Sequence, residues 1–306
     1  MERLDFVLPD FTRLSWVSDL ARKVWEPRLN RITKAWLEIE WLSVVSGIHC
    51  CITIASPKEF VARSGEWAKH GLNTFPLPIQ TNYPYLSADV RALGKPFALR
   101  VVLGKPQDVS DFKSAFDAGN DREINRLLGY PLCCSEFFRE TWVEQGLIDT
   151  TWPMAVATKA PLEGVRSIEV AGPPETNILW RWMGIRAVPH LPCRCDCQQS
   201  VEFGKKLMEV GSQAGYDTEM AWLLEILSWP VEWSALHGIA EIKTPVLKVS
   251  TRTDATPVKY VVRREGNTFP LEGAKGLNFP YRTPHQPLLT HSRGFQRGLD
   301  NPVKSH

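Results

Sequence analysis

The chain is organised around two cysteine-rich stretches, Gly129-Tyr130-Pro131-Leu132-Cys133-Cys134 and His190-Leu191-Pro192-Cys193-Arg194-Cys195-Asp196-Cys197. They hold five of the seven cysteines, and the other two, Cys50 and Cys51, are also adjacent. Gly129 stands where a glycine ends a helix, and Pro131 prevents that helix from continuing. The clustering predicts that the cysteines of the two stretches act together chemically.

Strand and helix patterns alternate on both sides of these stretches. Strands are predicted at about 47–55, 96–104 and 185–190, loop at 72–96, strand and loop at 150–175, and helices at about 57–70, 108–118, 121–128, 135–145, 176–183, 198–210 and 217–227. The last third holds three β-rich stretches, at 231–236, 239–249 and 258–264. We therefore expect an α/β fold: a layered mixed sheet with flanking helices, and a β-rich C-terminal third.

A single α/β domain is expected over residues 1–264, followed by an extended tail over 265–306 that is rich in Pro, Gly, Arg and His. The chain of 306 residues is long enough to bury a core without metal or disulfide cross-links. A bound metal is therefore expected to serve function more than folding.

Composition and motifs exclude several classes of protein. The sequence holds no apolar run of membrane-spanning length and no signal-peptide layout, so a cytoplasmic protein without membrane contact is expected. The net charge of +2 is too small to indicate nucleic acid, although basic tail residues such as Arg282 and His285 suit it. Glycine-rich nucleotide-binding motifs and the Gly-x-Ser-x-Gly elbow are absent from the sequence.

Both cysteine stretches precede a predicted helix, where the free amide groups favour thiolate, the form that binds metal. Cys193 and Cys197 have the spacing of zinc ligands, but the adjacent Cys133 and Cys134 are not expected to reach one small ion. A cluster with several irons is wider, and adjacent thiolates can bind different irons. The predicted cofactor is an iron–sulfur cluster, of the 4Fe–4S type, held by these four cysteines. Zinc and a dithiol redox site are the alternatives.

Other residues near the cysteines are candidates for catalysis. Cys195 is a spare thiol, either a replacement ligand or a reactive group beside an open iron. His190 could ligate the metal, donate a proton or pack, and Asp196 could cap the next helix or act as an acid–base group. Arg186 could bind a substrate carboxylate or pair with an acid. Cys50 and Cys51 are expected to be small core residues, since neighbours in a strand point to opposite faces and at most one could face a site.

The stretch 128–138, together with His190-x-Pro192-Cys193-x-x-x-Cys197, resembles a Gly-Tyr-Pro-x-Cys-Cys … His-x-Pro-Cys-x-x-x-Cys pattern of an uncharacterised prokaryotic protein family. The resemblance covers about the middle third of the chain. It implies that the four cysteines form one unit, and it implies no activity.

Three functions remain open on the sequence. The first is an iron–sulfur metalloenzyme that acts on a small polar metabolite by lyase, dehydratase or sulfur-transfer chemistry. The second is a zinc-stabilised module that binds a protein or RNA partner. The third is a thiol–disulfide oxidoreductase.

Overall fold

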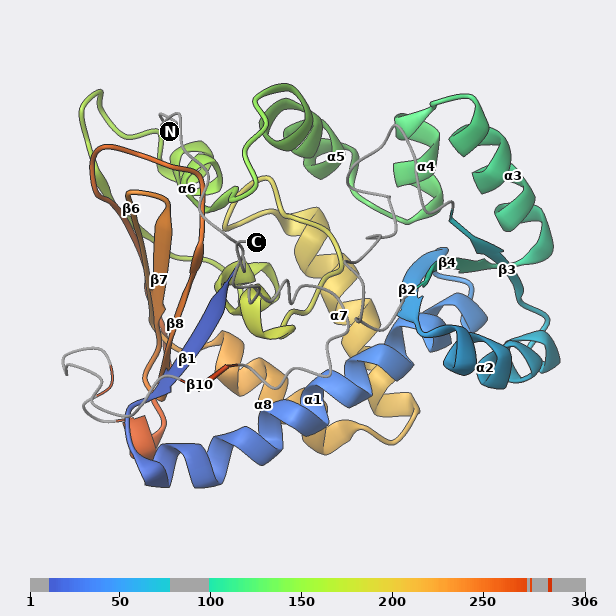
Figure 1. Ribbon diagram of the computed structural model, residues 1–306, viewed down its shortest axis with the longest axis horizontal. Helices are drawn as coiled ribbons and strands as arrows, with labels where there is room; N and C mark the ends of the chain where they lie inside the picture. Colours follow the sequence, from blue (N-terminus) through green and yellow to red (C-terminus); the bar gives the residue numbers. More distant parts are fainter. Residues whose placement is uncertain (1–10, 78–98, 274–275, 277–285, 288–306) are drawn as a thin grey trace, which may run out of the picture.

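Two sheets organise the part of the chain that the computed structural model describes, residues 11–77, 99–273, 276, 286 and 287 (Figure 1). The larger sheet runs, in spatial order, through β10 (Gln286–Pro287), β1 (Thr12–Trp16), β8 (Leu247–Arg252), β7 (Ile239–Lys243), β6 (Val231–Leu236), β9 (Tyr260–Arg264) and β5 (Ser167–Val170). All of its neighbouring strands are antiparallel except β5 and β9, which are parallel. The sheet is therefore mixed.

The smaller sheet is antiparallel and has the order β2 (Cys51–Ala55), β4 (Leu99–Gly104) and β3 (Asn73–Pro76). Helices α2 (Pro57–Lys69), α3 (Pro106–Asp117) and α4 (Asp121–Leu127) surround it at the opposite end of the molecule from the larger sheet (Figure 1). Helix α2 begins at a capping box, because Ser56 and Glu59 each bond the other's backbone amide.

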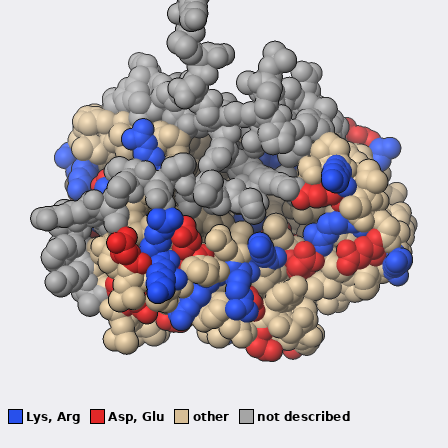
Figure 2. Space-filling model, turned by 60° about the horizontal axis from the view of Figure 1, so that its bottom comes forward, with Lys and Arg blue, Asp and Glu red and all other residues tan. Residues whose placement is uncertain are grey.

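Helix α1 (Asp19–Val45) runs along the molecule from the larger sheet towards the smaller one (Figure 1). Ser18 caps its first turn, and its buried face includes Trp25, Ile32, Trp36 and Ile39. Although α1 has the length to span a bilayer, neither it nor another helix among the described residues is apolar enough to do so. On the face shown in Figure 2, basic and acidic side chains are interspersed.

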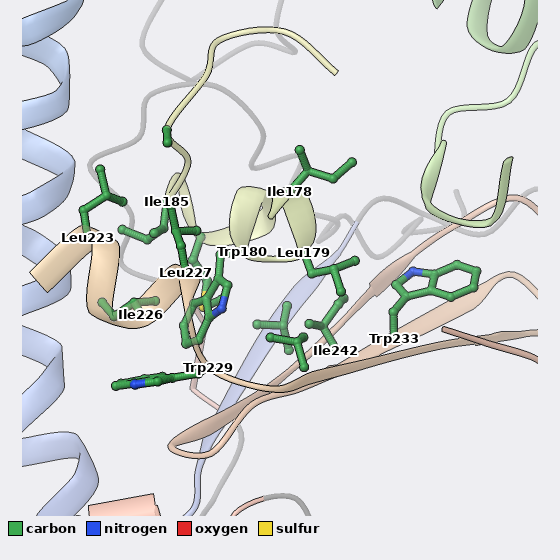
Figure 3. Packing of buried hydrophobic residues seen from close by; sticks show 14 of the residues in the cluster. Ile178, Leu179, Trp180, Ile185, Leu223, Ile226, Leu227, Trp229, Trp233 and Ile242 are labelled. Carbon is green, nitrogen blue, oxygen red and sulfur yellow. The ribbon is translucent and has the colours of Figure 1, made fainter. Parts of the chain in front are cut away.

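The main core lies between the larger sheet and a set of helices: α6 (Thr151–Lys159), the 3₁₀ helix η3 (Ile178–Met183), α7 (Gln198–Gln213) and α8 (Asp217–Leu227). In Figure 3 the apolar side chains of η3 and α8 converge with Trp233 and Ile242 of the sheet. Trp229 packs edge-on against Trp25 of α1, with ring centroids 4.5 Å apart. Burial of each such indole contributes about 5 kcal/mol, from roughly 200 Å² at about 25 cal/mol per Å².

The predicted α/β fold is confirmed, with its mixed sheet, flanking helices and β-rich C-terminal third. Four local predictions are wrong. The predicted loop at 72–96 contains strand β3, which pairs with β4, and residues 78–96 lie outside the described part of the chain. Residues 185–190 form a loop instead of a strand. Its Ile185, Ala187 and Val188 are buried by side-chain packing in the core and not by strand pairing. The region 150–175 contains helix α6, and a turn at Thr244 divides 239–249 into β7 and β8.

Two parts of the predicted tail contact the body of the protein. Strand β10 pairs with β1, and Glu272 in the 3₁₀ helix η4 (Leu271–Gly273) accepts a hydrogen bond of 3.2 Å from the Trp25 indole. Arg282 and His285 lie outside the described residues. The domain boundary at residue 264 stays a prediction.

Candidate metal centre

The first pair of cysteines lies in the first turn of α5 (Leu132–Phe138), rather than in the turn before it. The helix begins directly after Pro131, whose carbonyl accepts from the amides of Cys134 and Ser135 at 3.0 and 2.9 Å. Gly129 precedes it with a φ of +72°, and a Cβ there would stand 2.8 Å from the Cβ of His49. Only glycine suits this turn, which sets the direction in which α5 leaves.

The second stretch forms the loop that leads into α7, and Cys197 is the residue at the N-terminal cap of that helix. The hydroxyl of Thr158 accepts from the amide of Cys195 at 2.8 Å, and the hydroxyl of Thr176 donates to the carbonyl of Cys195. These bonds hold the loop against α6 and the core. They place Cys193 and Cys197 on the side of the loop that faces α5.

The structure brings together the four predicted ligands, Cys133, Cys134, Cys193 and Cys197, and we call them the four-cysteine site. All four sulfurs lie within 4.8 Å of one another, a group that can hold a metal ion. The Sγ atom of Cys197 stands 3.8 Å from that of Cys133 and 3.6 Å from that of Cys134. The adjacent pair is 3.9 Å apart. Cys134 and Cys197 are buried, while Cys133 and Cys193 are partly exposed.

Hydrogen bonds among the sulfurs shift their pKa values in opposite directions. The thiols of Cys134 and Cys193 hydrogen-bond to the sulfur of Cys197, which holds the Cys197 pKa well below its usual range. The hydrogen bonds of Cys193, with Cys134 first and with Cys197 second, raise its pKa well above the usual range. The close sulfurs thus compete for protons, which a cation can displace.

His190 lies next to the four-cysteine site without being one of its four ligands. Its Nε2 is 2.8 Å from the Ser200 hydroxyl, which in turn is 3.3 Å from the sulfur of Cys134. The imidazole packs against the rings of Tyr130 and Phe203, with centroids 5.3 and 5.7 Å away. Burial lowers the pKa of His190 to about 3, so the ring is neutral at pH 7.

Two of the other predicted site residues lie apart from the four sulfurs. Cys195 is 2 % exposed and packs in the main core, and burial raises the pKa of its thiol. Asp196 does not cap α7 but pairs with Arg194 at 2.9 Å, a bond that lowers the pKa of the Asp196 carboxyl. Their catalytic roles stay predictions.

Arg186 takes the second of its two expected roles, because its Nη2 pairs with the buried carboxylate of Glu40 at 2.7 Å. Substrate binding by Arg186 stays a prediction. Cys50 and Cys51 are both buried, in separate apolar clusters of the smaller sheet.

Our sequence analysis missed Ser200, whose side chain contacts both Cys134 and His190. The signal was present, since Ser200 follows Cys197 by three residues at the start of a predicted helix. Residues three apart share a helix face, and small hydroxyl residues next to ligands commonly bond them.

Comparison with known proteins adds no name to this site. The chain matches no protein-family model, and neither curated proteins nor solved structures give a match. The inference about function therefore rests on the geometry of the four-cysteine site.

Proposed function

We propose that the four-cysteine site binds one metal ion in tetrahedral geometry, and that this ion is zinc. Zinc–sulfur bonds of ~2.3 Å place the four sulfurs of a tetrahedron ~3.8 Å apart. The three distances among Cys133, Cys134 and Cys197 are 3.6, 3.8 and 3.9 Å. This agreement is the observation that carries the proposal.

A 4Fe–4S cluster needs a wider site. Each of its sulfur ligands binds a different iron, so the cysteine sulfurs stand roughly 6 Å apart. The sequence favoured a cluster because adjacent cysteines were not expected to reach one ion. In the first turn of α5, however, the Cys133 and Cys134 sulfurs are 3.9 Å apart, which removes that objection.

Four thiolates fill the coordination sphere of a tetrahedral ion, as in structural zinc sites, and leave no position for substrate. The ion would join α5 to the loop before α7, linking Cys134 and Cys193 across a separation of 59 residues. We therefore favour a zinc-stabilised module over an iron–sulfur enzyme. Its protein or RNA partner stays a prediction, as does the small-molecule substrate of the enzyme hypothesis.

Metal and sulfide analysis of protein purified without oxygen tests the proposal. One zinc per chain without acid-labile sulfide is expected, since the site holds one ion. Iron without sulfide would keep the tetrahedral site but overturn zinc, because iron also accepts four thiolates. Iron and sulfide in equal amounts would overturn the proposal and restore the cluster enzyme.

Two variants locate the ion. Cys134→Ser should lose the bound zinc, because it removes a buried ligand. Cys195→Ala is the matched control, since Cys195 lies two residues from both Cys193 and Cys197 but outside the four-cysteine site, and it should keep one zinc per chain.

A further inference from the structure

We propose that His190 and Ser200 form a hydrogen-bond relay that positions the sulfur of Cys134 for metal, with the histidine hydrogen on Nε2. The inference rests on the proposed function and deepens it, because it assigns two positioning residues to the four-cysteine site. It is drawn from three buried atoms: Nδ1 of His190, the hydroxyl oxygen of Ser200 and the sulfur of Cys134.

The first step is the position of the hydrogen on the neutral His190 ring, which carries one N–H group. Nδ1 of His190 is buried and has no hydrogen-bond partner among the described residues. A buried N–H without an acceptor is costly, so the hydrogen belongs on Nε2, which faces the Ser200 hydroxyl at 2.8 Å. Tyr130 and Phe203 pack against the ring and hold it in this orientation.

The second step is the direction of the Ser200 hydroxyl. When Nε2–H of His190 donates to its oxygen, the single hydroxyl hydrogen of Ser200 is free to point to the Cys134 sulfur, 3.3 Å away. The Cys134 sulfur then accepts a hydrogen bond from the Ser200 hydroxyl. The reverse chain would run from a Cys134 thiol through Ser200 to Nε2, and it would leave the buried Nδ1–H without an acceptor.

A second donor acts on the same sulfur. The amide of Cys193 donates to Cys134 Sγ at 3.4 Å, so the Cys134 sulfur receives a hydroxyl and an amide together. Such outer hydrogen bonds orient metal ligands, and their loss weakens metal affinity by roughly 10–100-fold. The relay thus orients the sulfur of Cys134, the most buried cysteine of the four-cysteine site, as a metal ligand.

The tautomer of His190 is measured by NMR on zinc-loaded protein labelled with ¹⁵N-histidine, with His190→Gln to assign the signal. Neutral imidazole with its hydrogen on Nε2 is expected. A hydrogen on Nδ1, or on both nitrogens, would overturn the relay. Zinc content is determined on the same sample, so a protein without zinc counts against the proposed function, whereas full zinc with the wrong tautomer counts against the relay alone.

Zinc affinity, measured by competition with a coloured chelator, separates the relay from simple packing. His190→Gln keeps an N–H near the place of Nε2 and should hold affinity within a few-fold. His190→Leu and Ser200→Ala should each weaken zinc binding by roughly tenfold or more. Ser135→Ala is the matched control, because the Ser135 hydroxyl bonds the carbonyl of Pro131 instead of a sulfur. Equal losses for His190→Gln and His190→Leu would contradict the inference.

Discussion

Removal of the metal should lower the unfolding temperature by an amount that follows from the position of the cysteines. An ion that joins Cys134 to Cys193 closes a loop of 59 residues, and the chain entropy lost by the unfolded state is worth about 4 kcal/mol. Unfolding entropy of about 2.1 cal/mol/K per residue amounts to about 0.6 kcal/mol/K for 306 residues. Loss of the cross-link should therefore lower Tm by about 6 °C.

The assay is thermal unfolding followed by circular dichroism, on zinc-loaded protein and on the same protein after chelation and dialysis. Cys134→Ser should unfold at the same temperature with and without zinc, because it lacks a ligand that the cross-link needs. Cys195→Ala should keep the zinc-dependent shift in Tm, even if the loss of a core thiol lowers Tm both with and without zinc.

Two results would refute this reasoning. Coincident unfolding curves for zinc-loaded and metal-free protein would show that the bound ion does not restrain the chain across the 59-residue loop. A full shift in Cys134→Ser would show that the stabilising ion binds away from the four-cysteine site.

Three further predictions concern an ion pair, a glycine turn and the buried histidine beside the four-cysteine site. Asp149→Asn should lower the free energy of unfolding by about 3 kcal/mol in urea titrations, because it removes the buried carboxylate that pairs with the partly buried Arg181 at 2.6 Å and leaves that charge uncompensated. Gly129→Ala should lower the free energy of unfolding more than its control, Gly164→Ala. Both glycines have positive φ, but only at Gly129 would the new Cβ collide with a neighbouring side chain. Equal losses of stability in the two variants would contradict the predicted clash. The folded-state pKa of His190, about 3, lies below its unfolded value of 6.5, so the unfolded chain takes up the proton first as the pH falls. Metal-free protein should therefore lose about 2 kcal/mol of stability between pH 7 and 5, a loss that His190→Gln should largely remove in the same urea titrations.

Much of the fold was predictable because its signals are local. Ser56, Pro57 and Glu59 predict the start of helix α2, and the alternation of apolar and polar residues over Val231–Leu236 predicts β6. The loop at 185–190 was mistaken for a strand because its apolar residues are buried like those of a strand. The surface against which these residues pack is formed by α7 and the sheet, and a short-range sequence pattern does not indicate it.

The four-cysteine site likewise combines features that are local in the sequence with features that depend on tertiary packing. The sequence by itself determined that four cysteines belong together, since chemistry and spacing single out Cys133, Cys134, Cys193 and Cys197. Only the tertiary structure decided how far apart their sulfurs stand, that Cys195 turns into the core, and that Ser200 connects His190 to Cys134. The physical reason is that ligand identity is a property of each side chain. The distances of 3.8 and 3.6 Å from the Cys197 sulfur to those of Cys133 and Cys134, in contrast, depend on how α5 packs against the start of α7, across more than 60 residues of chain.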